Sequence, residues 1–164
     1  MNQFNNADPK STESFLLFRF QGELYGTVLA SVREAVPFQV PRMVPNTRKN
    51  FLGIINLRGE ILGVVDLRIW FPNEKPNLKR SAPRALVVVE SASGVIGVAV
   101  DHIEGVCRLE RNEIESTTGM PGDVTAGGMI GIGKFSQGLA TLLDLNVLCG
   151  ALELATENKE RSAG

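Results

Sequence analysis

The sequence predicts a mainly β protein, built from two small barrels packed together with short helices and one C-terminal helix. Three observations predict this fold class. Short apolar runs alternate with turn residues along most of the chain, glycine is in excess at 17 of 164 residues, and the first half of the chain is repeated in the second. Frequent turns between short strands are typical of barrels rather than of alternating strand–helix units.

Turn and cap residues divide the first half into short elements. Gly22 separates two apolar runs and predicts a hairpin, and Arg58-Gly59-Glu60 separates two more. Pro37 ends a helical turn, because the residue before a proline resists the α region. Asp66 is a suitable N-cap for a short helix. The expected elements are strands at 15–21 and 23–29, a helical turn at 31–36, a short helix at 46–52, strands at 53–57 and 61–65, and a short helix at 67–71.

A polar segment with three prolines, residues 72–84, predicts a linker to the second half. The expected elements beyond it are strands at 85–90, 95–100, 105–109, 129–135 and 139–143, a glycine-rich loop at 119–128, and a helix from Asp144 to about Ala155. The expected organisation is a flexible tail at 1–14, one domain at 15–152 with subdomains at about 15–71 and 85–152, and a helix end and polar tail at 153–164.

An internal duplication underlies the two-barrel prediction. Shifts of 71 and then 78 residues match Phe15–Phe18 with Leu86–Val89, Gly26 with Gly97, Gly53 with Gly131, Ile61 with Leu139 and Asp66 with Asp144. Matched positions are mostly apolar core positions, so positions that break the match are free for other tasks. In this alignment of the two repeats, Glu34 corresponds to Gly105 and Arg58 corresponds to Ser136. Both charges are therefore candidates for binding a partner. Solvated surface charges would show the same pattern.

The composition weakens several classes of function. With 17 basic and 18 acidic residues, the net charge of −1 lacks the cation excess of a nucleic-acid-binding protein. The polar segment Met1–Ser14 does not have the layout of a signal peptide, and no run of apolar residues is long enough to span a membrane. Cys107 and Cys149 lie among apolar neighbours, which predicts buried free thiols. A cytoplasmic protein without membrane insertion fits these features.

The sequence predicts no catalytic residue, metal site or cofactor. Asp101 and His102 are adjacent, and adjacent residues of a strand point to opposite faces, so they do not form part of a catalytic triad. The alternative from a different class is a small enzyme that uses His102 or Cys107. An SH3-like nucleic-acid binder is a further alternative, which the near-neutral charge disfavours.

The segment Asn56–Arg68, with the sequence NLRGEILGVVDLR, carries the most specific pattern in the chain. It resembles the signature of the CheW family of bacterial chemotaxis coupling proteins. Glu23–Gly26 and Val32–Glu34 also resemble that family's first hairpin and following turn, and the resemblance covers about Ser14 to Leu152. Gly63 departs from the pattern, because many members have proline there. That difference bears on strand geometry more than on function.

The resemblance implies two SH3-like five-stranded barrels and a non-enzymatic adaptor. Such adaptors join the cytoplasmic tip of a chemoreceptor, a methyl-accepting chemotaxis protein, to the regulatory domain of a CheA-type histidine kinase in membrane-associated receptor arrays. The resemblance also implies a receptor-binding groove between the barrels, with Val32, Gly53, Val88 and Val106 as lining residues and Glu34 and Arg58 at the edge. It assigns no residues to the kinase-binding surface. A paralogous adaptor of a type IV pilus or another chemosensory system is the alternative function.

Overall fold

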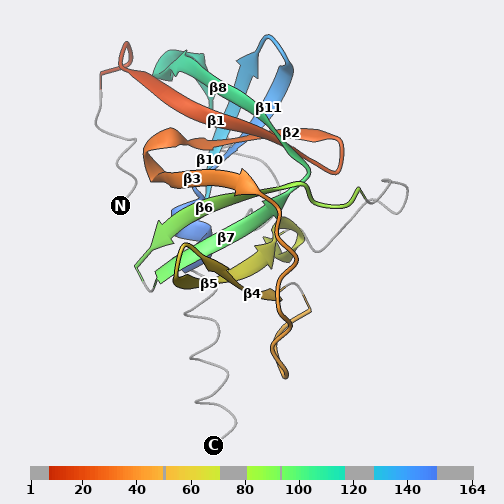
Figure 1. Ribbon diagram of the computed structural model, residues 1–164. Coiled ribbons are helices and arrows are strands. Elements are labelled where there is room, and N and C mark those ends of the chain that lie inside the picture. Colours follow the sequence, from red (N-terminus) through yellow and green to blue (C-terminus); the bar gives the residue numbers. More distant parts are fainter. Residues whose placement is uncertain (1–7, 50, 71–80, 93, 117–127, 151–164) are drawn as a thin grey trace, which may run out of the picture.

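The computed structural model describes residues 8–49, 51–70, 81–92, 94–116 and 128–150, and its strands form two sheets (Figure 1). The strands are β1 (Thr12–Phe20), β2 (Glu23–Val28), β3 (Val32–Pro37), β4 (Phe51–Leu57), β5 (Glu60–Asp66), β6 (Ala85–Ser91), β7 (Gly94–Val100), β8 (His102–Glu110), β9 (Ile114–Glu115), β10 (Met129–Phe135) and β11 (Gly138–Leu143). Short 3-10 helices are η2 (Leu29–Ser31), η3 (Leu67–Trp70) and η4 (Arg111–Glu113), and residues 145–150 are α-helical.

The strand order of the two sheets confirms the mainly β, two-barrel prediction. The first sheet has six strands in the order β8-β1-β2-β11-β10-β9, and the second has five in the order β3-β6-β7-β5-β4. Figure 1 shows the first sheet in the upper part of the molecule and the second in the lower part. Among the described residues, no helix is both long and apolar enough to cross a lipid bilayer.

The two sheets repeat each other residue by residue. Leu17 pairs with Gly26 in the first sheet, and their matched residues Val88 and Gly97 pair in the second. The parallel pairing of β2 with β11 recurs as the pairing of β7 with β5. The register shifts recur as well, at the equivalent points of β3 and β8 and of β4 and β10. The structure therefore confirms the duplication, including its irregular positions.

Each sheet takes strands from both halves of the chain, so the expected subdomains at 15–71 and 85–152 do not correspond to the sheets. The first repeat gives β1 and β2 to the first sheet and β3, β4 and β5 to the second. The second repeat does the reverse with β6 and β7 and with β8, β10 and β11. The physical reason is the short connection after each first hairpin. Residues Leu29–Ser31 and the single residue Asp101 lead the chain directly into the other sheet.

Two expected helical segments are wrong. Residues 32–36 lie in strand β3, which pairs with β6, and Phe51 begins strand β4 where a helix was expected at 46–52. The expected start of a helix at Asp144 is confirmed, since its carboxylate caps the helix by accepting the N–H of Val147 at 3.1 Å. Strand β1 begins at Thr12, inside the segment expected to be a tail. Most of the expected linker and glycine-rich loop, together with the chain beyond 150, lies outside the described residues.

The buried apolar side chains of the described residues form three clusters. One lies inside the first sheet and includes Phe15 and Leu142, and one lies inside the second and includes Leu62 and Val88. The largest cluster takes residues from both sheets and from the helix at 145–150, including Leu145 and Leu148. Each sheet thus has its own core, and the third cluster joins them.

Candidate functional site

Two ion pairs connect β3 to the β4–β5 hairpin. Arg58 Nη2 lies 2.8 Å from Glu34 Oε2, and Arg58 Nη1 donates a hydrogen bond to Glu34 Oε1 at 3.1 Å. Arg33 Nη1 lies 2.8 Å from Glu60 Oε2. Because β3 and β4 are the outer strands of the second sheet, these pairs join its two edges. The structure therefore brings together Glu34 and Arg58, the two charges that the duplication singled out.

The turn between β4 and β5 positions Arg58. Arg58 and Gly59 have φ angles of 50° and 87°, values typical of a two-residue type I′ turn, in which both residues are left-handed. The side chain of Asn56 supports the turn by accepting the N–H of Gly59 at 2.8 Å. The Arg58 side chain is 74% exposed, so its ion pair with Glu34 contributes at most about 1 kcal/mol to stability. A partner can reach this guanidinium without unfolding the hairpin.

Val32 and Gly53 lie near this pair but in different environments. Val32 begins β3, pairs with Val89 and packs half-buried against the cluster between the sheets. Gly53 has a φ of +132°, and an added Cβ would lie 2.2 Å from the carbonyl oxygen of Arg42. Gly53 thus allows a close approach of two backbone segments, which is a structural role.

The structure corrects the prediction that Val88 lines a groove. Its side chain is fully buried in the core of the second sheet, because β6 lies between β3 and β7 rather than at an edge. Val106 lies on β8 of the other sheet and is 53% exposed. It pairs with Leu16, which belongs to the central cluster on which Val32 packs. Of the expected groove residues, Val32 thus packs on the cluster between the sheets, and Val106 is exposed on the strand that pairs with Leu16 of the same cluster.

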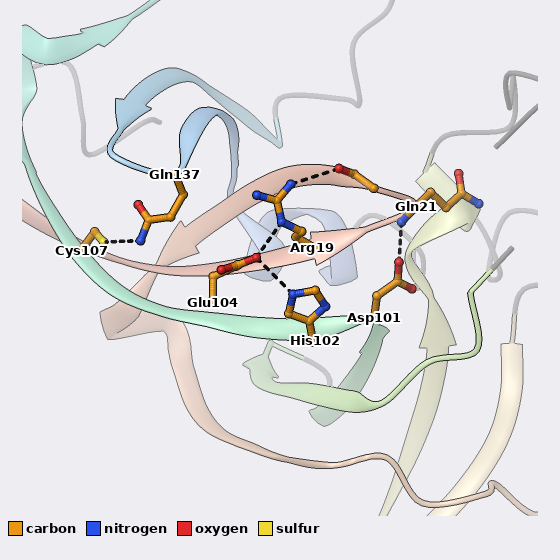
Figure 2. A network of polar contacts seen from close by, with 8 residues as sticks. Arg19, Gln21, Asp101, His102, Glu104, Cys107 and Gln137 are labelled. Carbon is orange, nitrogen blue, oxygen red and sulfur yellow. Dashed lines mark hydrogen bonds and ion pairs between the residues drawn. The ribbon is translucent and has the colours of Figure 1, made fainter. Parts of the chain in front are cut away.

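A polar network that sequence reasoning missed lies where β1 meets β8 (Figure 2). Arg19 Nε donates to Glu104 Oε1 at 2.6 Å, and His102 Nε2 lies 3.1 Å from the same oxygen. Hydrogen bonds from Arg19, and then from His102, hold the pKa of the Glu104 carboxyl below its ordinary value. A cavity of about 510 Å³ borders Arg19, His102 and Arg84. The sequence offered little signal, because β1 and β8 each carry more than one charged residue and their pairing is not local.

His102 and Cys107, which the alternative enzyme would use, have separate partners, as Figure 2 shows. The His102 ring faces Glu104, while the neighbouring Asp101 carboxylate accepts the N–H of Gln21 at 2.7 Å. Cys107 Sγ accepts a hydrogen bond from Gln137 Nε2 at 3.8 Å. Within the described part of the chain, no cluster of His, Cys, Asp and Glu side chains is arranged to hold a metal ion.

Comparison with known proteins accounts for both the fold and the motif. The model of the CheW-like domain matches residues 14–153. The chain is 24% identical over 143 residues to the chemotaxis protein CheW of Klebsiella aerogenes, covering 87% of this chain and 85% of that protein. It is 27% identical over 110 residues to the chemotaxis protein CheW of Bacillus subtilis, covering 67% and 69%.

A solved structure agrees with these matches. The crystal structure of the scaffolding protein TtCheW from Thermoanaerobacter tengcongensis superposes with a TM-score of 0.71 and 28% identity, covering 84% of this chain and 92% of that one. Proteins of the CheW family are scaffolds and adaptors rather than enzymes. The duplicated two-sheet fold, the NLRGE turn and the family match over nearly the whole chain lead to one conclusion: this protein belongs to the CheW-like domain family.

Proposed function

We propose that this chain is a non-enzymatic adaptor that couples chemoreceptor tips to a CheA-type histidine kinase. It would act in the cytoplasm and be recruited to membrane-associated receptor arrays. The observation that carries the proposal is the family match over residues 14–153, together with the exposed Arg58–Glu34 pair at the edge of the second sheet.

The receptor-binding surface proposed here consists of Val32, Glu34, Arg58 and Val106. The half-buried Val32 and the exposed Val106 offer the apolar side chains of this surface. An amphipathic receptor helix would bury its apolar face there, and the nearby charges would set its position along the surface. The exposed guanidinium of Arg58 suits an acidic residue of the receptor.

The test measures binding to two baits separately, a receptor hairpin tip and a kinase regulatory domain. Arg58→Ala is expected to weaken receptor binding about tenfold while leaving the unfolding free energy within about 1 kcal/mol, since the ion pair is exposed. Val32→Asp is expected to weaken it further. Lys10→Ala is the matched control, because it removes an exposed cation that does not belong to the proposed receptor-binding surface.

One result would refute the adaptor function, and a second would refute the assigned surface. Retention of neither bait by the wild-type chain contradicts it outright, and equal receptor binding by Arg58→Ala and wild type contradicts the assigned surface. A receptor hairpin from a pilus chemosensory system, used as a third bait, tests the alternative output. The double variant His102→Ala/Cys107→Ala is expected to couple normally, whereas a loss would support the enzyme alternative.

A further inference from the structure

Two adjoining cavities lie beside the β1–β2 turn, the β7–β8 connection and the segment that precedes β6. The larger has a volume of about 510 Å³ and borders Arg84 and Asp101. The smaller has a volume of about 120 Å³ and borders Phe20 and Asp101. Ser81 and Asp101 belong to the walls of both, so the two spaces adjoin. The larger volume falls in the range of about 300–1,000 Å³ that is typical of small-molecule sites.

Asp101 supplies a buried carboxylate to the shared wall. The residue is 9% exposed, and its Oδ2 accepts the N–H of Gln21 at 2.7 Å. No cationic side chain forms an ion pair with Asp101 in the described part of the chain. Burying a carboxylate costs free energy unless an opposite charge accompanies it. Asp101 therefore suits a cationic group of a bound molecule.

Arg84 supplies a positive charge to the larger cavity. Its position is fixed, because its N–H and its carbonyl oxygen both form backbone hydrogen bonds. Its side chain is exposed and forms no ion pair with any residue that the structure describes. The other basic side chains at this cavity, Arg19 and His102, both contact Glu104 Oε1, at 2.6 Å and 3.1 Å (Figure 2). Arg84 is therefore the cation that suits an anionic group of a bound molecule.

We propose that the adjoining cavities bind a free amino acid with an aliphatic side chain. Its carboxylate binds the guanidinium of Arg84, whose planar fork matches a carboxylate. Its ammonium group binds the carboxylate of Asp101, and its side chain packs in the smaller cavity against the buried Phe20 and Ala99. A zwitterion answers both unpaired charges at once, whereas a simple anion or a simple amine answers one. The proposal does not depend on binding to a receptor or to a kinase.

The experiment is an NMR titration of the ¹⁵N-labelled full chain with three probes of similar shape. Free leucine carries both charges, leucinamide lacks the carboxylate, and 4-methylpentanoate lacks the amine. Leucine is expected to cause saturable shifts of the amide signals of Gln21, Arg84 and Asp101. The other two probes are each expected to bind at least about tenfold more weakly, because each leaves one charge of the site without its partner.

Two variants test the assigned residues. Asp101→Asn removes the charge but keeps an oxygen that accepts the N–H of Gln21, and Arg84→Gln changes an exposed side chain. Each is expected to raise the dissociation constant for leucine at least about tenfold. Arg108→Gln is the matched control, because Arg108 is exposed on β8 and borders neither cavity, and it is expected to bind leucine like wild type. Thermal unfolding checks that each variant is folded, and Arg84→Gln carries the test if Asp101→Asn does not fold.

Three results would overturn the proposal. The first is the absence of saturable shifts with leucine. The second is equal binding of leucine and either single-charge probe, which indicates a site for one charge alone. The third is unchanged leucine binding by Arg84→Gln. None of these results bears on the adaptor function, because receptor and kinase binding are measured in a separate experiment.

Discussion

Replacing Thr27 with valine is expected to stabilise the protein. The Thr27 side chain is fully buried, and its hydroxyl has no hydrogen-bond partner among the described residues. Its counterpart in the second repeat is Val98, which is also fully buried. The neighbours match as well, since Thr27 pairs with Leu16 and Leu143, and Val98 pairs with the equivalent Val87 and Val65. The second repeat therefore already shows that valine fits this place.

The size of the effect follows from the buried hydroxyl. Leaving a polar group buried without a partner costs about 1–3 kcal/mol, and valine has nearly the same shape as threonine. Thr27→Val is expected to raise the unfolding free energy by about 1–2 kcal/mol, which corresponds to about 3–6 °C in a chain of this size. Urea unfolding monitored by circular dichroism measures it. Val98→Thr is expected to lower the unfolding free energy by a similar amount. An unchanged or lower value for Thr27→Val would refute the reasoning.

Two further predictions concern a glycine and a carboxylate. Gly53→Ala is expected to cost about 3 kcal/mol or more in a urea titration, whereas Gly59→Ala, whose Cβ would meet nothing within 4 Å, costs about 1 kcal/mol. Equal costs would contradict the close approach at Gly53. Because the folded-state pKa of Glu104 is lowered, its contribution to stability is present above the ordinary glutamate pKa and disappears as the pH falls through the folded value. The melting temperatures of wild type and Glu104→Gln should therefore converge in acid, and a constant difference would contradict this.

Strand β3 illustrates what sequence reasoning could not settle. Residues 31–36 were expected to form a helical turn that ends at Pro37, yet β3 alternates half-buried and exposed side chains as a strand does. Its strand character depends on pairing with β6, which comes from the other half of the chain. Local signals succeeded where the interaction itself is local, as at the turn that contains Gly22 and at the start of the helix at Asp144.

The candidate site divides in the same way. The broken match between the repeats identified Glu34 and Arg58 as the unusual charges, and the structure joins them in one ion pair. The family resemblance assigned Val88 to the groove, and the apolar pattern of β6 could not show that this residue is buried in the core. The pair between Arg33 and Glu60 was also missed, because β3 and β5 are far apart in the sequence and meet only when the sheet closes.

The sequence by itself determined the β-rich class, the duplication, the hairpins and the family motif, because turns, caps and alternating apolar residues act over a few neighbouring positions. Only the tertiary structure decided that each repeat divides its strands between both sheets and that Arg58 meets Glu34. The physical reason is that β-pairing joins segments far apart in the chain, and an apolar strand does not specify which partner it will bind. The short connections decide which sheet each strand joins. η2 leads from β2 in the first sheet to β3 in the second, and Asp101 leads from β7 in the second sheet to β8 in the first.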